Sequence, residues 1–148
     1  MNDETYLLDN NALSHLTRQQ IATDFFLERC RIPTEVLHEA RNHPDAETLR
    51  MVEYPTACGV LHHLSRVMES VAIDDTSLVD LYANKGAADP LLVACALDGT
   101  VDEARYLWGT IWVVVSNDKA VRAAARANNL ESLTREEFFA KTEEDWIS

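Results

Sequence analysis

Glycine and cysteine are scarce in this sequence, and their scarcity excludes several kinds of site. Only 4 of the 148 residues are glycine, and no glycine-rich loop that could cradle a nucleotide phosphate is present. The three cysteines, Cys30, Cys58 and Cys95, lie far apart, so neither a disulfide framework nor a CxxC metal site is indicated. We expect these cysteines to be small buried hydrophobic residues.

Long apolar runs are also missing. No run approaches the ~20 residues that a membrane-spanning helix needs. The N-terminal sequence MNDETY is acidic where a secretory signal would be basic, so we expect a cytoplasmic protein. The length of 148 residues and the hydrophobic content of 47% predict a single domain, 1–148, with its own core.

Basic residues are few relative to acidic ones. The chain has 13 Lys plus Arg and 25 Asp plus Glu, which gives a formal net charge of -12. This balance argues against a protein that coats DNA through a broad basic face. A nuclease is not excluded, because clustered carboxylates can hold divalent cations that attract phosphate. An acidic protein also suits a basic partner, although most of the acids need only keep the surface solvated.

The first apolar run of the chain ends in polar residues. Tyr6 to Leu8 is a short apolar run typical of a strand covered on both faces, and Asp9, Asn10 and Asn11 follow it. The carboxyl ends of such strands are where parallel sheets hold ligands. An alternative is that Asn10 or Asn11 caps a helix that begins near Ala12, with Asp9 favouring its positive end.

The remaining pattern predicts strands that alternate with helices. No hairpin signal separates them, so we expect an α/β fold with a mostly parallel sheet. The expected strands are 30–33, 71–74 and 111–115. The expected helices are 17–30, 34–41, 59–71, 76–86, 88–97 and one that begins at Lys119. Thr34 is expected to cap the helix 34–41 and His43-Pro44 to end it, a turn is expected at Asp98-Gly99, and a capping box is expected from Thr134 to Glu137.

A second strong strand also ends near a carboxylate. The run 111–115 has five apolar residues, three of them valine, and Asp118 follows it. Because parallel strands end along one edge of a sheet, Asp9 and Asp118 could form one site, joined by Asp89 and by Glu35 or Glu39 from two helices. Such oxygen ligands are what Mg²⁺ or Mn²⁺ requires. From the residues alone, a metal site and independent helix caps remain equal alternatives.

Other candidate motifs have simpler explanations. His38 begins an apparent zinc HExxH motif, but Asn42 occupies the second histidine position, which excludes that site. The helical stripe from Val60 to Val71 is more typical of core than of an interface. Trp108 and Trp112 could stack on a nucleobase, although packing is the preferred interpretation.

Four segments together resemble one family. YLLDNNALSHL, IPTEVLHEA, KGAADPLLVACAL and WVVVSNDKAV occur in the order and at the distances typical of PIN domains, which include the VapC-type toxin ribonucleases. The resemblance spans nearly the whole chain. It implies a three-layer α/β/α sandwich with a mostly parallel central sheet. It also implies cleavage of RNA with Mg²⁺ or Mn²⁺ held by three or four acids.

The resemblance assigns roles to individual residues. It implies Asp9, Glu39, Asp89 and Asp118 as the catalytic, metal-binding acids, with Asn11 and Ser116 supporting them and Lys85 or Lys119 touching phosphate. Glu39 is preferred to Glu35 because Pro33 and Val36 match the family's pattern before its second acid. Two departures are Asn10, where Thr or Ser is common, and a long segment, 98–110, before the last strong strand.

The implied function is a metal-dependent endoribonuclease. Its substrate is RNA, and its role is the toxin of a toxin-antitoxin pair; an antitoxin protein and a second copy of the chain are the partners that this interpretation allows. The main alternative is a non-catalytic PIN-like module that binds RNA or protein, although such a module would be expected to lack one of the acids. A phospho-acceptor receiver domain is a third hypothesis, but its second acid and its lysine have no convincing counterpart here.

Overall fold

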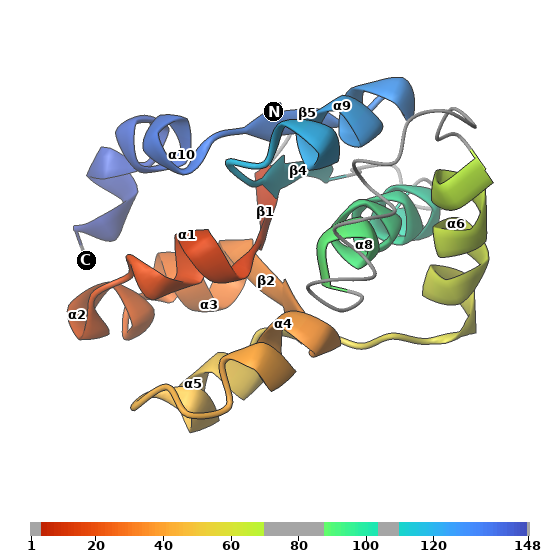
Figure 1. Ribbon diagram of the computed structural model, residues 1–148. Helices are drawn as coiled ribbons and strands as arrows, with labels where there is room; N and C mark the ends of the chain where they lie inside the picture. Colours follow the sequence, from red (N-terminus) through yellow and green to blue (C-terminus); the bar gives the residue numbers. More distant parts are fainter. Residues whose placement is uncertain (1–3, 70–87, 104–109, 148) are drawn as a thin grey trace.

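A single parallel sheet organises the protein. The computed structural model describes residues 4–69, 88–103 and 110–147, without the side chains of 69, 88, 89, 102 and 103 (Figure 1). In these residues the sheet has the order β3-β2-β1-β4-β5, and every pairing is parallel. The strands are β1 (Glu4–Leu8), β2 (Cys30–Pro33), β3 (Glu53–Tyr54), β4 (Ile111–Val115) and β5 (Glu131–Leu133).

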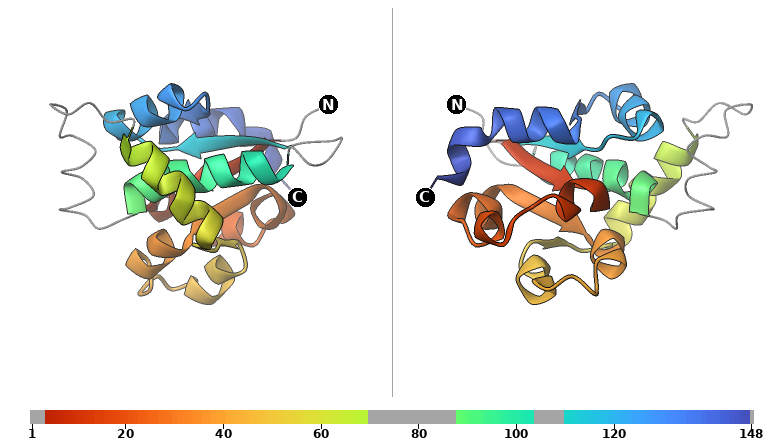
Figure 2. Two further views of the ribbon diagram at one scale, coloured as in Figure 1. Left: turned by 90° about the vertical axis from the view of Figure 1, so that its right-hand side faces the viewer. Right: turned by 60° about the vertical axis from the view of Figure 1, so that its left-hand side comes forward.

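Helices cover both faces of this sheet. Side chains alternate along β1, so that Tyr6 and Leu8 face one core and Leu7 faces the other. The first core is covered by α1 (Asn10–Ser14), α2 (Arg18–Ile21), α3 (Asp24–Arg29), α4 (Thr34–Glu39), α5 (Ala46–Arg50) and α10 (Arg135–Lys141). The second is covered by α6 (Cys58–Glu69), α8 (Ala88–Glu103) and α9 (Lys119–Ala127) (Figure 2). The predicted three-layer α/β/α sandwich is thereby confirmed.

Large apolar side chains fill the two cores. Phe26 and Phe138 are fully buried in the first, and Leu92 and Val114 are fully buried in the second. Burial of a side chain of this size stabilises the fold by roughly 1.5–3 kcal/mol. Cys30 and Cys95 are buried as predicted, whereas Cys58 is exposed at the start of α6.

Side-chain caps decide where several helices begin. The predicted helix 17–30 is two helices, because Thr23 ends the first and caps α3 by accepting a hydrogen bond from the Phe26 N–H at 3.2 Å. The predicted cap at Thr34 is wrong: Pro33 precedes α4, and the Thr34 hydroxyl donates instead to Glu53 at 2.8 Å. The predicted capping box from Thr134 to Glu137 is confirmed.

The predicted turn at Asp98-Gly99 is also wrong. Helix α8 continues through both residues to Glu103. A Cβ at position 99 would lie 2.4 Å from Cε2 of Trp112, so glycine is present there to let helix and strand approach closely. The predicted strand 71–74 and helix 76–86 lie outside the described residues.

The described helices do not include one suited to a membrane. Across residues 4–69, 88–103 and 110–147, none is both long enough and apolar enough to span a bilayer. A short 3-10 helix, η1 (Glu143–Trp146), follows α10, and its Trp146 ring packs edge-on to Phe25.

Candidate functional site

The order in which the chain adds strands to the sheet reverses after β3, so that β1 has β2 on one side and β4 on the other. The chain adds β2 and β3 on one side of β1 and then places β4 and β5 on the other. The crevice outside the carboxyl ends of two such strands is the usual ligand site of an open parallel sheet. A cavity of about 470 Å³ lies here, lined by Asp9, Asn10, Asn11, Ser14, Glu39, Asn117 and Asp118.

Asp9 lies at the end of β1 and caps the helix that follows. Its side chain is only 8% exposed, and its Oδ1 accepts a hydrogen bond from the Ala12 N–H at 2.8 Å. Asn10 and Asn11 are therefore the first residues of α1, and the prediction that one of them caps this helix is wrong. The cap accounts for one carboxylate oxygen and fixes the direction of the other.

Burial makes the charge on Asp9 unfavourable. The pKa of Asp9 is raised, mainly by burial and to a smaller extent by the nearby Asp118 carboxylate. Hydrogen bonds from Ala12 and Ser116 and the positive charge of Arg135 lower this pKa, but they do not offset the two effects that raise it. A carboxylate in this position would be relieved by a cation bound beside it.

Asp118 follows β4, three positions after Val115, the last residue of that strand. It caps α9, and its Oδ1 accepts hydrogen bonds from the N–H groups of Ala120 at 2.9 Å and Val121 at 3.3 Å. Its Oδ2 has no hydrogen bond to any described residue. Helix capping and ligand binding are therefore compatible at both aspartates, and they are not the exclusive alternatives that the sequence left open.

Ser116 connects the two aspartates. It is 1% exposed, its Oγ accepts from the Asp118 N–H at 3.1 Å, and its hydroxyl lies near enough to Asp9 to help lower the pKa of that carboxyl. Its own N–H donates to the Leu133 carbonyl at 3.0 Å, which holds the residue in the sheet. Ser116 therefore lies between the two aspartates, and its supporting role stays a prediction.

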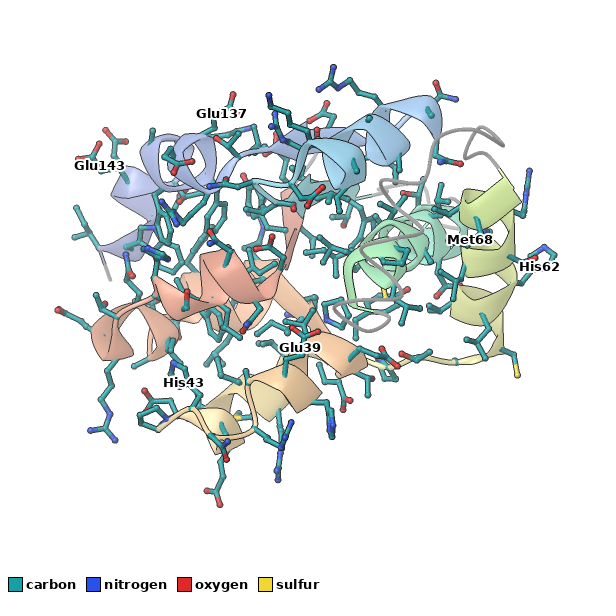
Figure 3. All side chains as sticks on the ribbon, in the orientation of Figure 1. Glu39, His43, His62, Met68, Glu137 and Glu143 are labelled. Carbon is teal, nitrogen blue, oxygen red and sulfur yellow. The ribbon has the colours of Figure 1, made fainter. Side chains whose placement is uncertain are left out.

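Glu39 and Glu35 lie in different surroundings. Glu39 is the last residue of α4, and its exposed side chain extends from that helix toward α1 and lines the cavity (Figure 3). Glu35, one turn earlier, accepts a hydrogen bond from the Thr56 hydroxyl at 2.7 Å. The structure thus brings Glu39, and not Glu35, to the same cavity as Asp9 and Asp118.

The other predicted residues are placed less completely. Asp89 is the second residue of α8, and its side chain lies outside the described part of the chain, as do Lys85 and Trp108. Lys119 is the exposed first residue of α9. Trp112 is 8% exposed and packs edge-on to Tyr54 with ring centroids 5.3 Å apart, which agrees with a packing role.

The cavity offers oxygen donors of the kind that Mg²⁺ and Mn²⁺ prefer. Asp9 and Asp118 provide carboxylates from adjacent strands, and Glu39 provides a third from α4. Within the described side chains, however, no three His, Cys, Asp or Glu residues come close enough together to hold a metal ion. The donor chemistry therefore fits a divalent cation, while the described carboxylates alone do not form a closed coordination shell.

The contacts of Asn117 and Arg135 at this cavity were not predicted from the sequence. Asn117 lines the cavity, and its Oδ1 accepts a hydrogen bond from the Arg135 N–H at 2.6 Å. Arg135 also donates through Nη1 to Oδ1 of Asn11 at 2.9 Å. No spacing in the sequence relates position 135 to position 11, so only the fold could reveal this contact.

Comparison with known proteins adds no identification. The chain matches no protein-family model, and a search of curated proteins likewise finds no match.

Proposed function

We propose that this chain is a divalent-metal-dependent endoribonuclease that hydrolyses RNA phosphodiester bonds, as its resemblance to PIN domains implies. The observation that carries the proposal is that Asp9 and Asp118 both line one cavity beside β1 and β4, the adjacent strands between which the strand order reverses. Glu39 enters the same cavity from α4, as the sequence pattern required.

The proposed roles follow from the positions of these side chains. Asp9 and Asp118 would hold Mg²⁺ or Mn²⁺ with oxygens oriented by their helix caps, and Glu39 and Asp89 would complete the ligand set. When bound, the cation lowers the pKa of a water molecule and neutralises charge that develops on the phosphate. Ser116 keeps the Asp9 carboxylate in position through its hydroxyl. No side chain needs to act as a nucleophile.

The net charge of the chain also supports a metal-dependent mechanism. With a net charge of -12 and three carboxylates at the cavity, the protein alone repels the phosphate backbone of RNA. A divalent cation held by Asp9, Glu39 and Asp118 would supply the positive charge that an approaching phosphate needs. RNA binding near the cavity is therefore expected to depend on the metal.

Cleavage of RNA by the purified protein tests this proposal. We expect cleavage with Mg²⁺ or Mn²⁺ and none in excess chelator, with activity restored when the metal is returned. Asp9→Asn and Asp89→Asn should each lower the rate by at least about 100-fold, because loss of a ligand should cost more than the roughly 10–100-fold typical of a residue that only orients a ligand. Undiminished cleavage by both variants, at unchanged folding, would refute the assignment.

A non-catalytic RNA-binding or protein-binding module is the second candidate. It is favoured by one observation, the lack of three converging metal ligands within the described side chains. Binding of RNA or protein that needs no metal, without cleavage, would support this candidate over the nuclease.

We further propose that the nuclease acts in the cytoplasm as a toxin held in check by a separate antitoxin. A compact nuclease with few basic residues has little of its own to direct it to one RNA. Expression of the chain alone in its host should arrest growth, and expression of Asp9→Asn should not. Normal growth with abundant, active protein would exclude the toxin role and leave the nuclease proposal intact. Gel filtration of the purified protein tests whether two copies associate.

A further inference from the structure

Arg135 lies at the rim of the acidic cavity. It is the first residue of α10, which follows β5, the strand next to β4. Its main-chain N–H binds Asn117 and its guanidinium binds Asn11, and both asparagines line the cavity. Asn11 and Asn117, which both line the cavity, therefore hold Arg135 in place.

The guanidinium retains hydrogen-bond donors after these contacts are made. An arginine side chain has five N–H donors in a fixed planar fork. Nη1 points to Asn11 at 2.9 Å and to Nδ1 of His15 at 3.3 Å, and Nη2 donates to Glu136 at 2.7 Å. Nε and the second N–H of Nη2 have no hydrogen-bond partner in the described part of the chain. The side chain is 23% exposed, so a ligand in the cavity can reach it.

Arg135 differs in this respect from arginines that serve the fold. Arg29 donates its Nε to the Glu4 carbonyl at 2.6 Å, and Arg31 donates Nη1 to two backbone carbonyls, those of Leu27 and Cys30. Such contacts satisfy main-chain acceptors away from the cavity. Two of the contacts of Arg135 are instead made with side chains that line the cavity, those of Asn11 and Asn117, and its positive charge favours the charged form of Asp9.

We infer that Arg135 binds a non-bridging phosphate oxygen of the RNA backbone next to the bond that is cleaved. This inference rests on the proposed nuclease function. A planar guanidinium suits a phosphate group, to which arginine can bind with two parallel hydrogen bonds, and Nε and one N–H of Nη2 remain for such a contact. The contact positions the backbone and reads no sequence. It also supplies positive charge at the rim of a cavity whose walls are otherwise acidic.

A structural role for Arg135, in which it only joins α10 to α1, makes a different prediction. Loss of a structural link lowers stability and activity together and leaves the salt dependence of RNA recognition unchanged. Loss of a phosphate contact makes the dependence of log(kcat/KM) on log[salt] shallower by about 0.7, the value for one contact to a single strand. The salt slope therefore separates the two roles.

The experiment measures kcat and KM for a short, labelled single-stranded RNA of randomised sequence, in Mg²⁺, between about 50 and 200 mM salt. Arg135→Gln is compared with Arg18→Gln, which removes the same charge from a side chain that is 85% exposed and paired with Asp45. We expect Arg135→Gln to lower kcat/KM by about 10- to 100-fold with the shallower slope, and Arg18→Gln to stay within about twofold of wild type. Arg135→Lys keeps the charge and should recover part of the rate with the wild-type slope.

Each outcome has a distinct meaning. A rate within twofold of wild type or an unchanged slope for Arg135→Gln, while Asp9→Asn is inactive, would overturn the role of Arg135 and leave the nuclease proposal standing. No cleavage by the wild-type protein would overturn the proposed function itself. If Arg135→Gln does not fold, Arg135→Lys decides: full wild-type kcat/KM argues against a two-bond contact, and a rate lowered with the slope retained supports it.

Discussion

Asp9 and Asp118 follow neighbouring strands and share two features: each caps the next helix, and each lines the same cavity. Each uses Oδ1 to accept main-chain N–H groups, and the hydroxyl and N–H contacts of Ser116 connect the two residues. The caps hold the two negatively charged carboxylates near one another, and their repulsion lowers the stability of the metal-free protein. Several measurable consequences follow from that arrangement.

The first prediction concerns stability and pH. The folded-state pKa of Asp9 is raised, chiefly by burial, so its contribution to stability is fully present below the unfolded pKa of about 3.9 and is lost as pH rises through the folded pKa. In chelator at pH 8, Asp9→Asn should therefore melt a few degrees higher than wild type, at about 2–4 °C per kcal/mol. The asparagine Oδ1 can still accept the Ala12 N–H, so the cap is kept.

The control for this prediction is Asp145→Asn. Asp145 is exposed, so its replacement removes the same charge without relieving burial. The advantage of Asp9→Asn should exceed that of Asp145→Asn at pH 8 and should shrink toward pH 4. An Asp9→Asn variant that is less stable than wild type at both pH values would show that burial of this charge is not the dominant effect.

The second prediction distinguishes two glutamates. Glu39→Gln should lower the rate of RNA cleavage at least tenfold, because Glu39 lines the cavity. Glu35→Gln should leave the rate within about twofold, because one helical turn displaces its carboxylate by ~5.4 Å, and its partner is Thr56. A rate assay on both purified variants checks this, and the reverse ranking would show that Glu35 is the functional acid of α4.

The third prediction concerns the pH dependence of cleavage. Charged Asp9 is the form that binds a cation, so activity should rise with pH as Asp9 loses its proton. The Ser116 hydrogen bond lowers the pKa of Asp9, and Ser116→Ala should raise it further and move the rise in kcat/KM toward alkaline pH. Ser132→Ala on β5 is the control. A Ser116→Ala profile that superimposes on the wild-type profile would exclude this role.

The fourth prediction tests the close contact between α8 and β4. Three ring atoms of Trp112 would lie 2.4 to 2.7 Å from a Cβ at position 99. Gly99→Ala should therefore lower the free energy of unfolding by about 1–3 kcal/mol despite the better helix propensity of alanine. Denaturant unfolding measures this, with Val101→Ala, an exposed neighbour on the same helix, as the control. A more stable Gly99→Ala variant would mean that Trp112 moves away without cost.

The central strands and their terminal acids could be predicted from the sequence. The apolar runs of β1 and β4 are buried on both faces, and such runs are distinctive because every side chain must be apolar. The edge strands were missed, since β3 has two residues and β5 has three, too few to show a period.

Other errors arose where two local structures suit the same residue. Thr23 can continue a helix or cap one, and its hydrogen bond to Phe26 selects the cap. Gly99 is typical of a turn, but here its missing side chain makes room for Trp112. The role of Arg135 depends on a contact with Asn11 across 124 positions of sequence, which no local pattern encodes.

The most direct test of the central claim is calorimetric titration of the purified protein with Mn²⁺. We expect Mn²⁺ to bind saturably to the wild-type protein and to Glu35→Gln, and much more weakly to Glu39→Gln and Asp118→Asn. We expect no measurable Mn²⁺ binding to Asp9→Asn. Circular dichroism checks that all variants are folded. Failure of the wild-type protein to bind Mn²⁺, or equal binding by Asp9→Asn, would contradict the claim that these carboxylates form one metal site.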